Sequence, residues 1–389
     1  MIYVLILLAI MLNAIITFAY TSTHAAQPAS MWGLLSVNFL YFMGISQTGV
    51  VISGIFRISK SKWGKFFSRF GEIMTISYIP IGVVTYYIIY YGGTEHLFWW
   101  AQPGAAEAAH GHLSPWLDKD LYFWRNTGLM IFFYGVSIAY YVLARKEEFY
   151  ERAHAPVPEN IEKALNVMAG VVFLGYIALN TNISWDFGMM IIKHWESTIF
   201  PPFYWVGNIY AAAPFLFILG YCYIHKRTGK VLNKEHLDSM SIFILGFTLV
   251  WIYMFWSQHI VIIYGDMPAL TTPLVKQMSG YYSKFFIAMM LAIFFIPFFA
   301  FLFRDIKMRL ATHIIVGVVV CIGVWLSRYL MIMPVFENGA SPAFATWTNL
   351  SLVVGGLASV IFSVLVFQKL FPEVAITTTP QGEPEKEHH

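Results

Sequence analysis

The sequence predicts an all-α membrane protein with about ten transmembrane helices, and three observations lead to this prediction. Apolar residues make up 58% of the 389-residue chain, charged residues only 12%, and the mean hydropathy is +0.63. A soluble domain carries about 25% charged residues, so this composition leaves too few to cover a water-exposed surface. Ten apolar segments approach the roughly 20 residues of a transmembrane helix, and Lys and Arg gather in alternate loops between them.

The predicted spans cover most of the chain. Runs this long that are apolar on all sides predict helices, because a membrane strand needs about ten residues of alternating polarity. We expect one membrane domain over residues 1–371 and a disordered polar tail over 372–389. The predicted spans are Ile2–Tyr20, Met31–Phe56, Phe70–Tyr91, Leu121–Leu143, Leu165–Thr181, Pro202–Ile224, Ser241–Tyr264, Tyr282–Phe303, Ala311–Met333 and Trp347–Phe367.

The loops set the orientation. Three basic residues, Lys119, Lys193 and Lys276, lie in one set of alternate loops, against sixteen in the other set. The positive-inside rule therefore predicts that the sixteen, and both termini, lie in the cytoplasm. We call their end of the molecule the basic end and the opposite end the outer end. The sixteen are Arg57, Lys60, Lys62, Lys65, Arg69, Arg145, Lys146, Arg152, Lys163, Lys226, Arg227, Lys230, Lys234, Arg304, Lys307 and Arg309.

Residue types exclude most cofactor sites. The chain has two cysteines, Cys222 and Cys321, and both lie in predicted spans. Iron–sulfur clusters, covalently attached haem and zinc fingers need other cysteine patterns. A membrane b haem needs two facing histidines on different helices, and His259 is the one histidine clearly inside a predicted span. We therefore expect no metal-bound or covalently bound cofactor on this chain.

Polar residues within or next to the predicted spans gather toward the outer end. Such groups are costly in lipid and are functional-site hypotheses by default. The structural alternative is that each basic residue reaches the interface and pairs with Asp186, Glu196 or Asp266. As a set, these residues favour a buried site near the outer leaflet. They are Arg125, Asn180, Asn182, Asp186, Gln258, His259, Lys284 and Arg328.

A second polar stripe follows the second and third predicted spans. Glu72 and Thr75 share one helical face, and Pro80 removes a backbone donor there. A proton path from the cytoplasm has this pattern, and so does ordinary hydrogen bonding between closely packed helices. Both interpretations stay open. The candidates for the proton path are Gln47, Glu72, Thr75 and Tyr78.

The connection from residue 184 to 202 is the most unusual stretch. It is too apolar for a free loop, and too short and charged for a span. We expect an interfacial helix with Trp185 and Trp195 at headgroup level. We also expect Thr198 to cap the next helix, with Pro201 and Pro202 in its first turn.

This connection resembles the D-[WF]-x-M-S-L-x-P-H-W-x-S-T-I-F signature of membrane subunits of alternative complex III, in the NrfD/polysulfide-reductase-like superfamily. The run 199–203 is closer to the subunit ActC. Two further stretches resemble ActF: 257–268 (S-Q-x-x-x-I-W-Y-G-N-x-P-E-E) and 296–307 (P-F-x-x-L-L-x-R-x-x-K). The stretch 117–125 resembles the family pattern Y-L-N-x-x-F-F-x-x-R. The positions that match the first signature are Asp186, Met189, His194, Trp195, Ser197, Thr198, Ile199 and Phe200.

The chain also departs from these patterns. Ala269 and Leu270 stand where ActF has two acids after the proline. His259 replaces an apolar or aromatic residue, and Glu196 replaces an aromatic residue or a histidine. Lys193 stands in place of the proline before His194. The missing acids weaken any transfer of proton-path roles to the loop that follows the seventh span.

The resemblance implies two four-helix bundles with flanking helices in the bacterial inner membrane. It implies a cofactor-free subunit of a quinol:cytochrome c oxidoreductase that contributes to quinol binding, proton translocation or both. Haem c and iron–sulfur clusters are then expected on partner chains. The implied partners are a sister NrfD-like subunit, a multihaem cytochrome c, a periplasmic iron–sulfur/molybdopterin-like subunit and a terminal oxidase.

Quinol oxidation releases two protons with two electrons, so its site needs a proton acceptor and a hydrogen-bond donor. We predict Asp186 and His259 as catalytic residues. Two alternatives stay open: a scaffold subunit without a quinone site, and a secondary transporter, although no internal repeat supports the latter. The candidates for quinol binding are Arg125, His194, Glu196, Gln258, Asp266 and Arg328.

Overall fold

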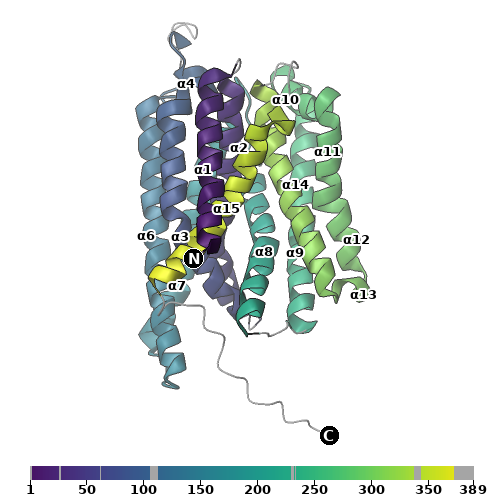
Figure 1. Ribbon diagram of the computed structural model, residues 1–389. Coiled ribbons are helices and arrows are strands. Elements are labelled where there is room, and N and C mark those ends of the chain that lie inside the picture. The colour runs from purple at the N-terminus through teal and green to yellow at the C-terminus, as the bar shows by residue number, and fades with distance from the viewer. Residues whose placement is uncertain are drawn as a thin grey trace.

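The computed structural model describes residues 2–25, 28–61, 63–105, 113–228, 232, 234–336 and 343–371, and these ranges contain helices but no strand (Figure 1). Ten spans in them are long and apolar enough to cross a membrane, as the sequence predicts. The predicted tail lies outside the described residues. The spans are α1 (Ile2–His24), α2 (Pro28–Ile58), α3 (Lys65–Ile88), α6 (Lys119–Arg152), α7 (Glu159–Ser184), α8 (Phe200–Thr228), α9 (Lys234–Gly265), α11 (Ser283–Met290) with α12 (Ile296–Leu302), α14 (Leu310–Phe336) and α15 (Trp347–Leu370).

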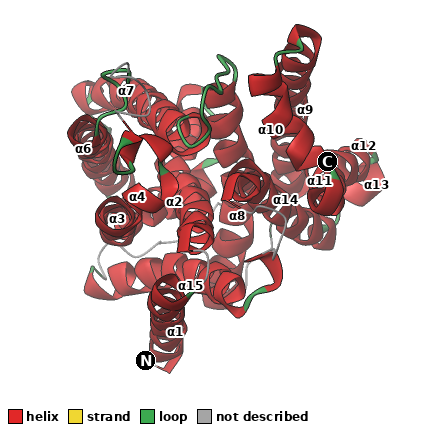
Figure 2. Cartoon of the chain, turned by 90° about the horizontal axis from the view of Figure 1, so that it is seen from above, coloured by secondary structure: helices red, strands yellow, loops and turns green. Residues whose placement is uncertain are grey.

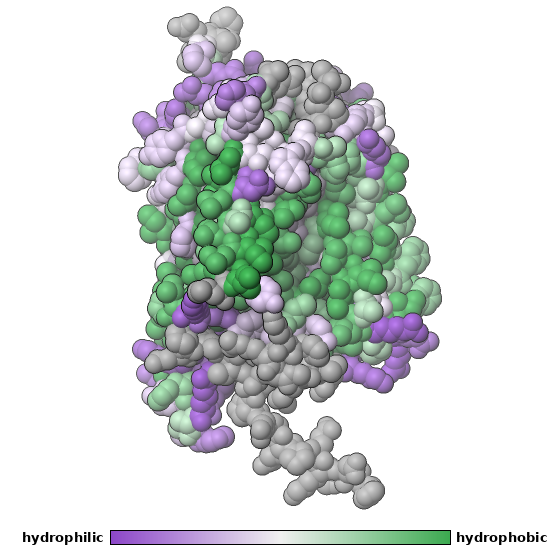
Figure 3. All heavy atoms as spheres, viewed as in Figure 1, coloured by the Kyte–Doolittle hydropathy of each residue, from purple (hydrophilic) through white to green (hydrophobic). Residues whose placement is uncertain are grey.

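The surface has the pattern of a membrane protein. On the face that Figure 3 shows, apolar residues cover most of the middle of the molecule, and hydrophilic residues lie toward both ends. Large apolar side chains such as Ile131, Val261 and Ile315 are exposed, as expected where lipid is the solvent. The short helix α13 (Arg304–Lys307) lies at the bottom of Figure 1, and α4 (Thr94–Leu97) and α10 (Pro268–Met278) lie at the top. The chain is therefore a multi-pass membrane protein.

Contacts between the described helices define two groups and a flanking pair, whose arrangement Figure 2 shows from above. The first group is α2, α3, α6 and α7, and the second is α8, α9, α11–α12 and α14. The central helix α2 also contacts α8 and α14 and so joins the groups. α1 packs mainly on α15, and α15 packs on α2 and α3. This is the expected arrangement of two four-helix bundles with flanking helices.

The contact between α2 and α3 is close because glycines meet there. A Cβ at Gly49 would lie 2.3 Å from the carbonyl oxygen of Gly71. At the same crossing, the Thr75 hydroxyl donates to Ser46 O at 2.6 Å and accepts from the Val50 N–H at 2.9 Å. Small residues permit such backbone approach between membrane helices. Thr75 therefore supports the structural interpretation of the second polar stripe.

The eighth span contains a π-helical turn, Leu291–Phe295, between α11 and α12. Pro297 has no N–H, so it cannot bond the Ile293 carbonyl four residues earlier. The Tyr210 hydroxyl of α8 donates to that carbonyl at 2.7 Å and lies 2.8 Å from Thr248 Oγ1 of α9. Membrane helices tolerate proline where a neighbour satisfies the freed group. This bond joins α8 and α9 to the interrupted eighth span.

The expected interfacial helix after α7 is not formed. α7 continues into a π-helical turn, Trp185–Met189, and irregular turns follow until α8. Trp195 is 7% exposed and donates from Nε1 to Leu270 O at 3.2 Å, so it is not a headgroup anchor. Ile191 is buried too. These two apolar side chains pack into the protein and do not form the lipid-facing side of an interfacial helix. Pro201 and Pro202 do lie in the first turn of α8.

Candidate functional site

Arg125 of α6 and Asp186 of the π-helical turn form a buried ion pair at the outer end. Arg125 donates from Nη2 to Asp186 Oδ1 and from Nε to Oδ2. Asn126 Nδ2 and Asn182 Nδ2 also donate to Oδ2, at 2.5 and 3.2 Å. The Asp186 side chain is 0% exposed and that of Arg125 is 7% exposed. Arg125 therefore pairs with Asp186 inside the protein and does not extend to the interface.

The surroundings of Asp186 suit a carboxylate. Its contacts with Arg125, Asn126 and Asn182 are all made to N–H donors, and an ionised carboxylate only accepts hydrogen bonds. A protonated Asp186 would place a hydrogen against one of these donors. The arrangement therefore suits a fixed negative charge that positions Arg125. Direct proton uptake by Asp186 stays a prediction.

A mostly apolar pocket of about 310 Å³ lies beside this ion pair. Arg125 reaches its wall, because Nη1 donates to Trp116 O at 2.6 Å and the guanidinium carbon lies 4.4 Å from the Trp116 ring centroid. Concave apolar sites with a few polar groups are typical of ligand binding. We call this the outer pocket. It is lined by Trp99, Trp116, Leu117, Trp185, Met189, Met190, Ile192, His194 and Trp195.

His194 supplies a titratable side chain to the outer pocket. Its φ of 60° is left-handed, a conformation that is uncommon outside glycine. The backbone turns sharply here, between the buried Ile191 and Trp195. Glu196 is exposed and does not line the pocket. The structure therefore brings His194 to the candidate site and leaves Glu196 outside it.

Gln258 and His259 of α9 line a separate cavity of about 30 Å³, which we call the inner cavity. Gln277 and Ser327 complete its polar lining. Ile192 and Trp195 line both this cavity and the outer pocket. Asp186 lines neither. The two predicted catalytic residues, Asp186 and His259, are thus not brought into one site, although their surroundings share a wall. The apolar residues that complete the lining are Gly188, Phe200, Phe203, Phe255, Leu274, Met289, Leu330 and Met331.

Arg328 does not extend to the outer interface. It is 1% exposed and lines neither cavity. Its Nη2 donates to Tyr204 O at 2.7 Å and to Asn208 Oδ1 at 2.9 Å, and its guanidinium carbon lies 4.1 Å from the Tyr204 ring centroid. In the described ranges no carboxylate lies within 4 Å of it. The aromatic face and these oxygens therefore stabilise its charge.

A chain of hydrogen-bonded side chains starts at Asn208, next to Arg328. Asn208 Nδ2 donates to Asn180 Oδ1, Asn180 Nδ2 to Gln47 Oε1, and Gln47 Nε2 to the Tyr134 hydroxyl, each at 3.1 Å. In each of these bonds, the residue nearer to Arg328 along the chain of hydrogen bonds is the donor. The chain joins α14, α8, α7, α2 and α6. Because amides are not titratable side chains, this arrangement suits helix positioning better than proton transfer through Gln47.

Glu72 lies near the basic end and is 3% exposed. It accepts from the Ser53 hydroxyl at 2.6 Å and from Arg69 Nη1 at 2.7 Å. Ser53 Oγ lies 3.2 Å from the Tyr140 hydroxyl. This trio of a carboxylate and two hydroxyls suits proton transfer. In the described part of the chain, no hydrogen bond connects it with Gln47.

The remaining sequence candidates lie apart from both cavities. Tyr78 accepts from the Ser359 hydroxyl of α15 at 3.4 Å. Asp266 is exposed at the end of α9, with a left-handed φ of 43°. Lys284 Nζ lies 4.4 Å from the centroid of the Tyr281 ring, which suits an interfacial anchor. These contacts give Tyr78 and Lys284 structural interpretations and leave Asp266 at the surface.

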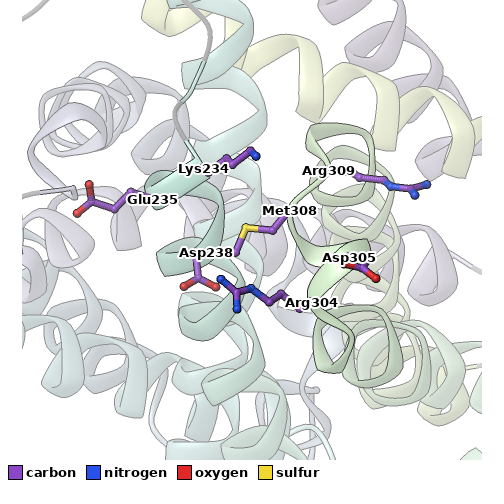
Figure 4. A pocket seen from close by; sticks show the side chains of 7 residues that line it. All are labelled: Lys234, Glu235, Asp238, Arg304, Asp305, Met308 and Arg309. Carbon is purple, nitrogen blue, oxygen red and sulfur yellow. The ribbon is translucent and has the colours of Figure 1, made fainter. Parts of the chain in front are cut away.

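A larger pocket of about 630 Å³ opens at the basic end, between the start of α9 and α13 (Figure 4). Lys307 Nζ and Asp238 Oδ1 form an ion pair at 2.5 Å beside it. The lining mixes three basic and three acidic side chains, most of them exposed, so it concentrates neither sign of charge. The outer pocket is the better functional candidate. The lining residues at the basic end are Lys234, Glu235, Asp238, Arg304, Asp305, Met308 and Arg309.

Sequence reasoning missed Asn126 and the tryptophans Trp99 and Trp116. Asn126 directly follows Arg125 in a span, and two polar residues together in lipid were a usable signal. Trp99 and Trp116 give no signal in the sequence that distinguishes them from ordinary interfacial tryptophans. No family model and no curated protein matches this chain. Among the described residues, no three His, Cys, Asp or Glu side chains are grouped to hold a metal ion.

Proposed function

We propose that this chain is the membrane subunit of a quinol-oxidising oxidoreductase complex of the alternative complex III type in the bacterial inner membrane. The observation that carries the proposal is the outer pocket. Four tryptophans and two methionines line it, and a buried ion pair lies behind its wall. We infer that a quinol headgroup binds there.

The pocket has the properties that a quinol headgroup needs. Its volume of about 310 Å³ lies in the range of small-molecule sites. Aromatic walls stack on a flat ring, since such pairs gain about 0.5–1.5 kcal/mol beyond area burial. His194 lines the pocket and supplies a nitrogen that accepts a proton from a quinol hydroxyl. The pocket thus offers aromatic walls that stack on the quinol ring and a nitrogen that accepts a proton from one of its hydroxyls.

Arg125 acts through the wall of the pocket. A positive charge in a low-dielectric environment favours the negative charge that develops on a quinol oxygen as its proton leaves. The Asp186 carboxylate, held by Asn126 and Asn182, fixes the guanidinium against Trp116. We assign Asp186 as the residue that positions Arg125 and balances its charge. Removing the Asp186 carboxylate would then alter quinol binding and the rate of quinol oxidation, although Asp186 does not touch the quinol.

The overall step balances in atoms and electrons. Quinol becomes quinone, two protons leave toward the outer end, and two electrons pass to redox centres of partner subunits, proposed to be iron–sulfur clusters and haem c. His194 receives one of the protons. The partners are those implied by the resemblance. This chain supplies the headgroup site, and the partner chains carry the electrons.

A scaffold subunit without a quinone site is the second candidate. The chain of amides from Arg328 to Tyr134 and the fully bonded carboxylate of Asp186 favour it, because both arrangements hold helices together. Such a subunit would assemble with the same partners. The two candidates differ in whether residues of the outer pocket change quinol-driven turnover.

The first experiment is purification with partners in mild detergent, followed by a redox difference spectrum with quinol as electron donor. We expect quinol-reducible haem in co-purifying subunits. His194→Gln should then lower turnover tenfold or more (about 1.4 kcal/mol) with the subunits still assembled. Asp186→Asn, which removes the charge that holds Arg125, should also lower turnover.

His96→Gln is the matched control, because His96 is exposed at the outer end and does not line the pocket. Its turnover should equal that of the unaltered complex. Normal turnover in both His194→Gln and Asp186→Asn would favour the scaffold. A protein without partners or reducible haem would overturn both candidates.

A further inference from the structure

The inner cavity contains polar groups that the protein leaves unsatisfied. Gln258 is 4% exposed, and its Oε1 has no hydrogen-bond partner in the described ranges. The side chain lines the cavity together with His259, Gln277 and Ser327. An unpaired amide oxygen in such surroundings costs about 1–3 kcal/mol. A ligand that donates a hydrogen bond in the cavity would remove this cost.

His259 offers a second acceptor in the same cavity. Its Nδ1 lies 2.7 Å from Phe255 O, and a carbonyl oxygen only accepts, so Nδ1 carries the hydrogen. In the neutral ring, Nε2 then has a free lone pair. The ring stacks on Phe255 with centroids 3.9 Å apart, and no carboxylate in the described ranges pairs with it.

The volume of the inner cavity limits the size of the ligand that it can hold. About 30 Å³ is too small for a quinol ring, and a water molecule needs about 10–15 Å³ by this measure together with two to four polar partners. Water donates two hydrogen bonds, which matches two acceptors, Gln258 Oε1 and His259 Nε2. Ser327 and Gln277 provide further partners.

We propose that the inner cavity holds one or two ordered water molecules between Gln258 and His259, and that His259 accepts a proton through them. The water site rests on the cavity alone. The proton step rests on the proposed quinol site of the outer pocket. The two cavities share the wall residues Ile192 and Trp195, and the proton step requires the water and a quinol hydroxyl to meet at this wall.

The proton step uses the water as a relay. Water accepts the proton of a quinol hydroxyl while it donates one of its own protons to His259 Nε2. The ring becomes an imidazolium, the water is regenerated, and the electrons leave to the redox centre of a partner. Gln258 touches the water and not the quinol, so it is a positioning residue. His194 would then accept one of the two quinol protons, and His259 would accept the other.

The water site is tested without quinol, on the full chain in lipid nanodiscs. One measurement is a structure in which ordered water is resolved. The other is deuterium exchange at the C2 position of histidines, which requires access of water to the ring. We expect density within hydrogen-bond distance of Gln258 Oε1 and His259 Nε2, and measurable exchange at His259.

Gln258→Leu removes the amide with little change in size. It should remove the density and slow exchange at His259 about fivefold, the effect of one lost hydrogen bond. Ser257→Ala is the matched control, because Ser257 is half-buried, does not line the cavity and bonds its own helix at Tyr253 O. His313 is the internal reference for folding, since it is fully buried and both ring nitrogens contact backbone carbonyls.

Different results would overturn the water site, the proton step and the proposed function. A cavity without water density, exchange at His259 as slow as at His313, or unchanged exchange in Gln258→Leu would each overturn the water site. If the water site is present and Gln258→Leu leaves quinol-driven turnover at its normal rate and pH profile, the proton step is overturned. A complex that does not oxidise quinol removes the proposed function and the proton step, while the water measurements stand.

Discussion

The guanidinium of Arg125 and the carboxylate of Asp186 form an ion pair that the protein encloses almost completely. Arg328, the other buried arginine near the outer end, has no carboxylate within 4 Å in the described ranges and rests on the ring of Tyr204. The two arginines therefore differ in what balances their charge. Asn126 and Asn182 add donors to Asp186, so the first pair belongs to a fully bonded network.

Breaking the Arg125–Asp186 pair on one side should destabilise the protein more than replacing both residues. Asp186→Ala leaves a buried guanidinium without its partner, at a cost of about 3–5 kcal/mol, whereas apolar replacement of a whole pair is often neutral. We expect the double variant Arg125→Met/Asp186→Leu to melt at a higher temperature than Asp186→Ala. The measurement is thermal unfolding in detergent, followed by tryptophan fluorescence. A double variant as unstable as the single one would contradict this account.

His259→Phe should lower quinol-driven cytochrome reduction by one to two orders of magnitude, which is about 1.4–2.7 kcal/mol. The variant keeps an aromatic ring stacked on Phe255 and removes the nitrogen that accepts the proton. The readout is steady-state turnover of the assembled complex, with Ser257→Ala as control. If the histidine is merely tolerated at this position, turnover will match that of the control, and His259 has no part in the mechanism.

Composition and hydropathy were sufficient to predict the ten spans, because a transmembrane helix needs about 20 predominantly apolar residues even where, as in α2, it is buried among other helices. The helix α10 was not predicted, since it is too short to leave a hydropathy signal. The π-helical turns were missed as well. The turn at Leu291–Phe295 depends on Pro297 and on a hydroxyl from α8, and that contact does not follow from the local sequence.

The candidate site was predicted in part. The cost of isolated charges in lipid predicts a carboxylate partner for Arg125. The sequence left Asp186, Glu196 and Asp266 open, and the structure pairs Arg125 with Asp186. The outer pocket could not be predicted, because Trp99, Trp116 and Trp195 come from segments that meet only in the folded chain. Arg328 is buried, as the prediction of a buried site requires, but it bonds to Tyr204 and Asn208 of α8 and lines neither cavity.

Glu72→Gln tests the proton path at the basic end. The amide keeps a contact with the Ser53 hydroxyl but loses the titratable group and its ion pair with Arg69. If protons enter here, variant complexes in liposomes should show slower proton uptake from the basic side at unchanged assembly. Glu147→Gln is the control, because Glu147 forms a comparable pair with Arg57 at 2.8 Å but is more exposed. Equal rates in the two variants would leave Glu72 with a structural role.

Tyr210→Phe should destabilise the second group of helices. It removes the hydroxyl that satisfies the Ile293 carbonyl, and a buried carbonyl without a partner costs about 1–3 kcal/mol. The effect should appear as a lower melting temperature of the purified chain. Pro297→Ala restores a backbone N–H at the position where the helix lost one. The double variant Tyr210→Phe/Pro297→Ala should therefore recover part of the loss, because the carbonyl regains a donor within its own helix. Additive destabilisation by the two changes would show that the Tyr210 hydroxyl does not compensate for the proline.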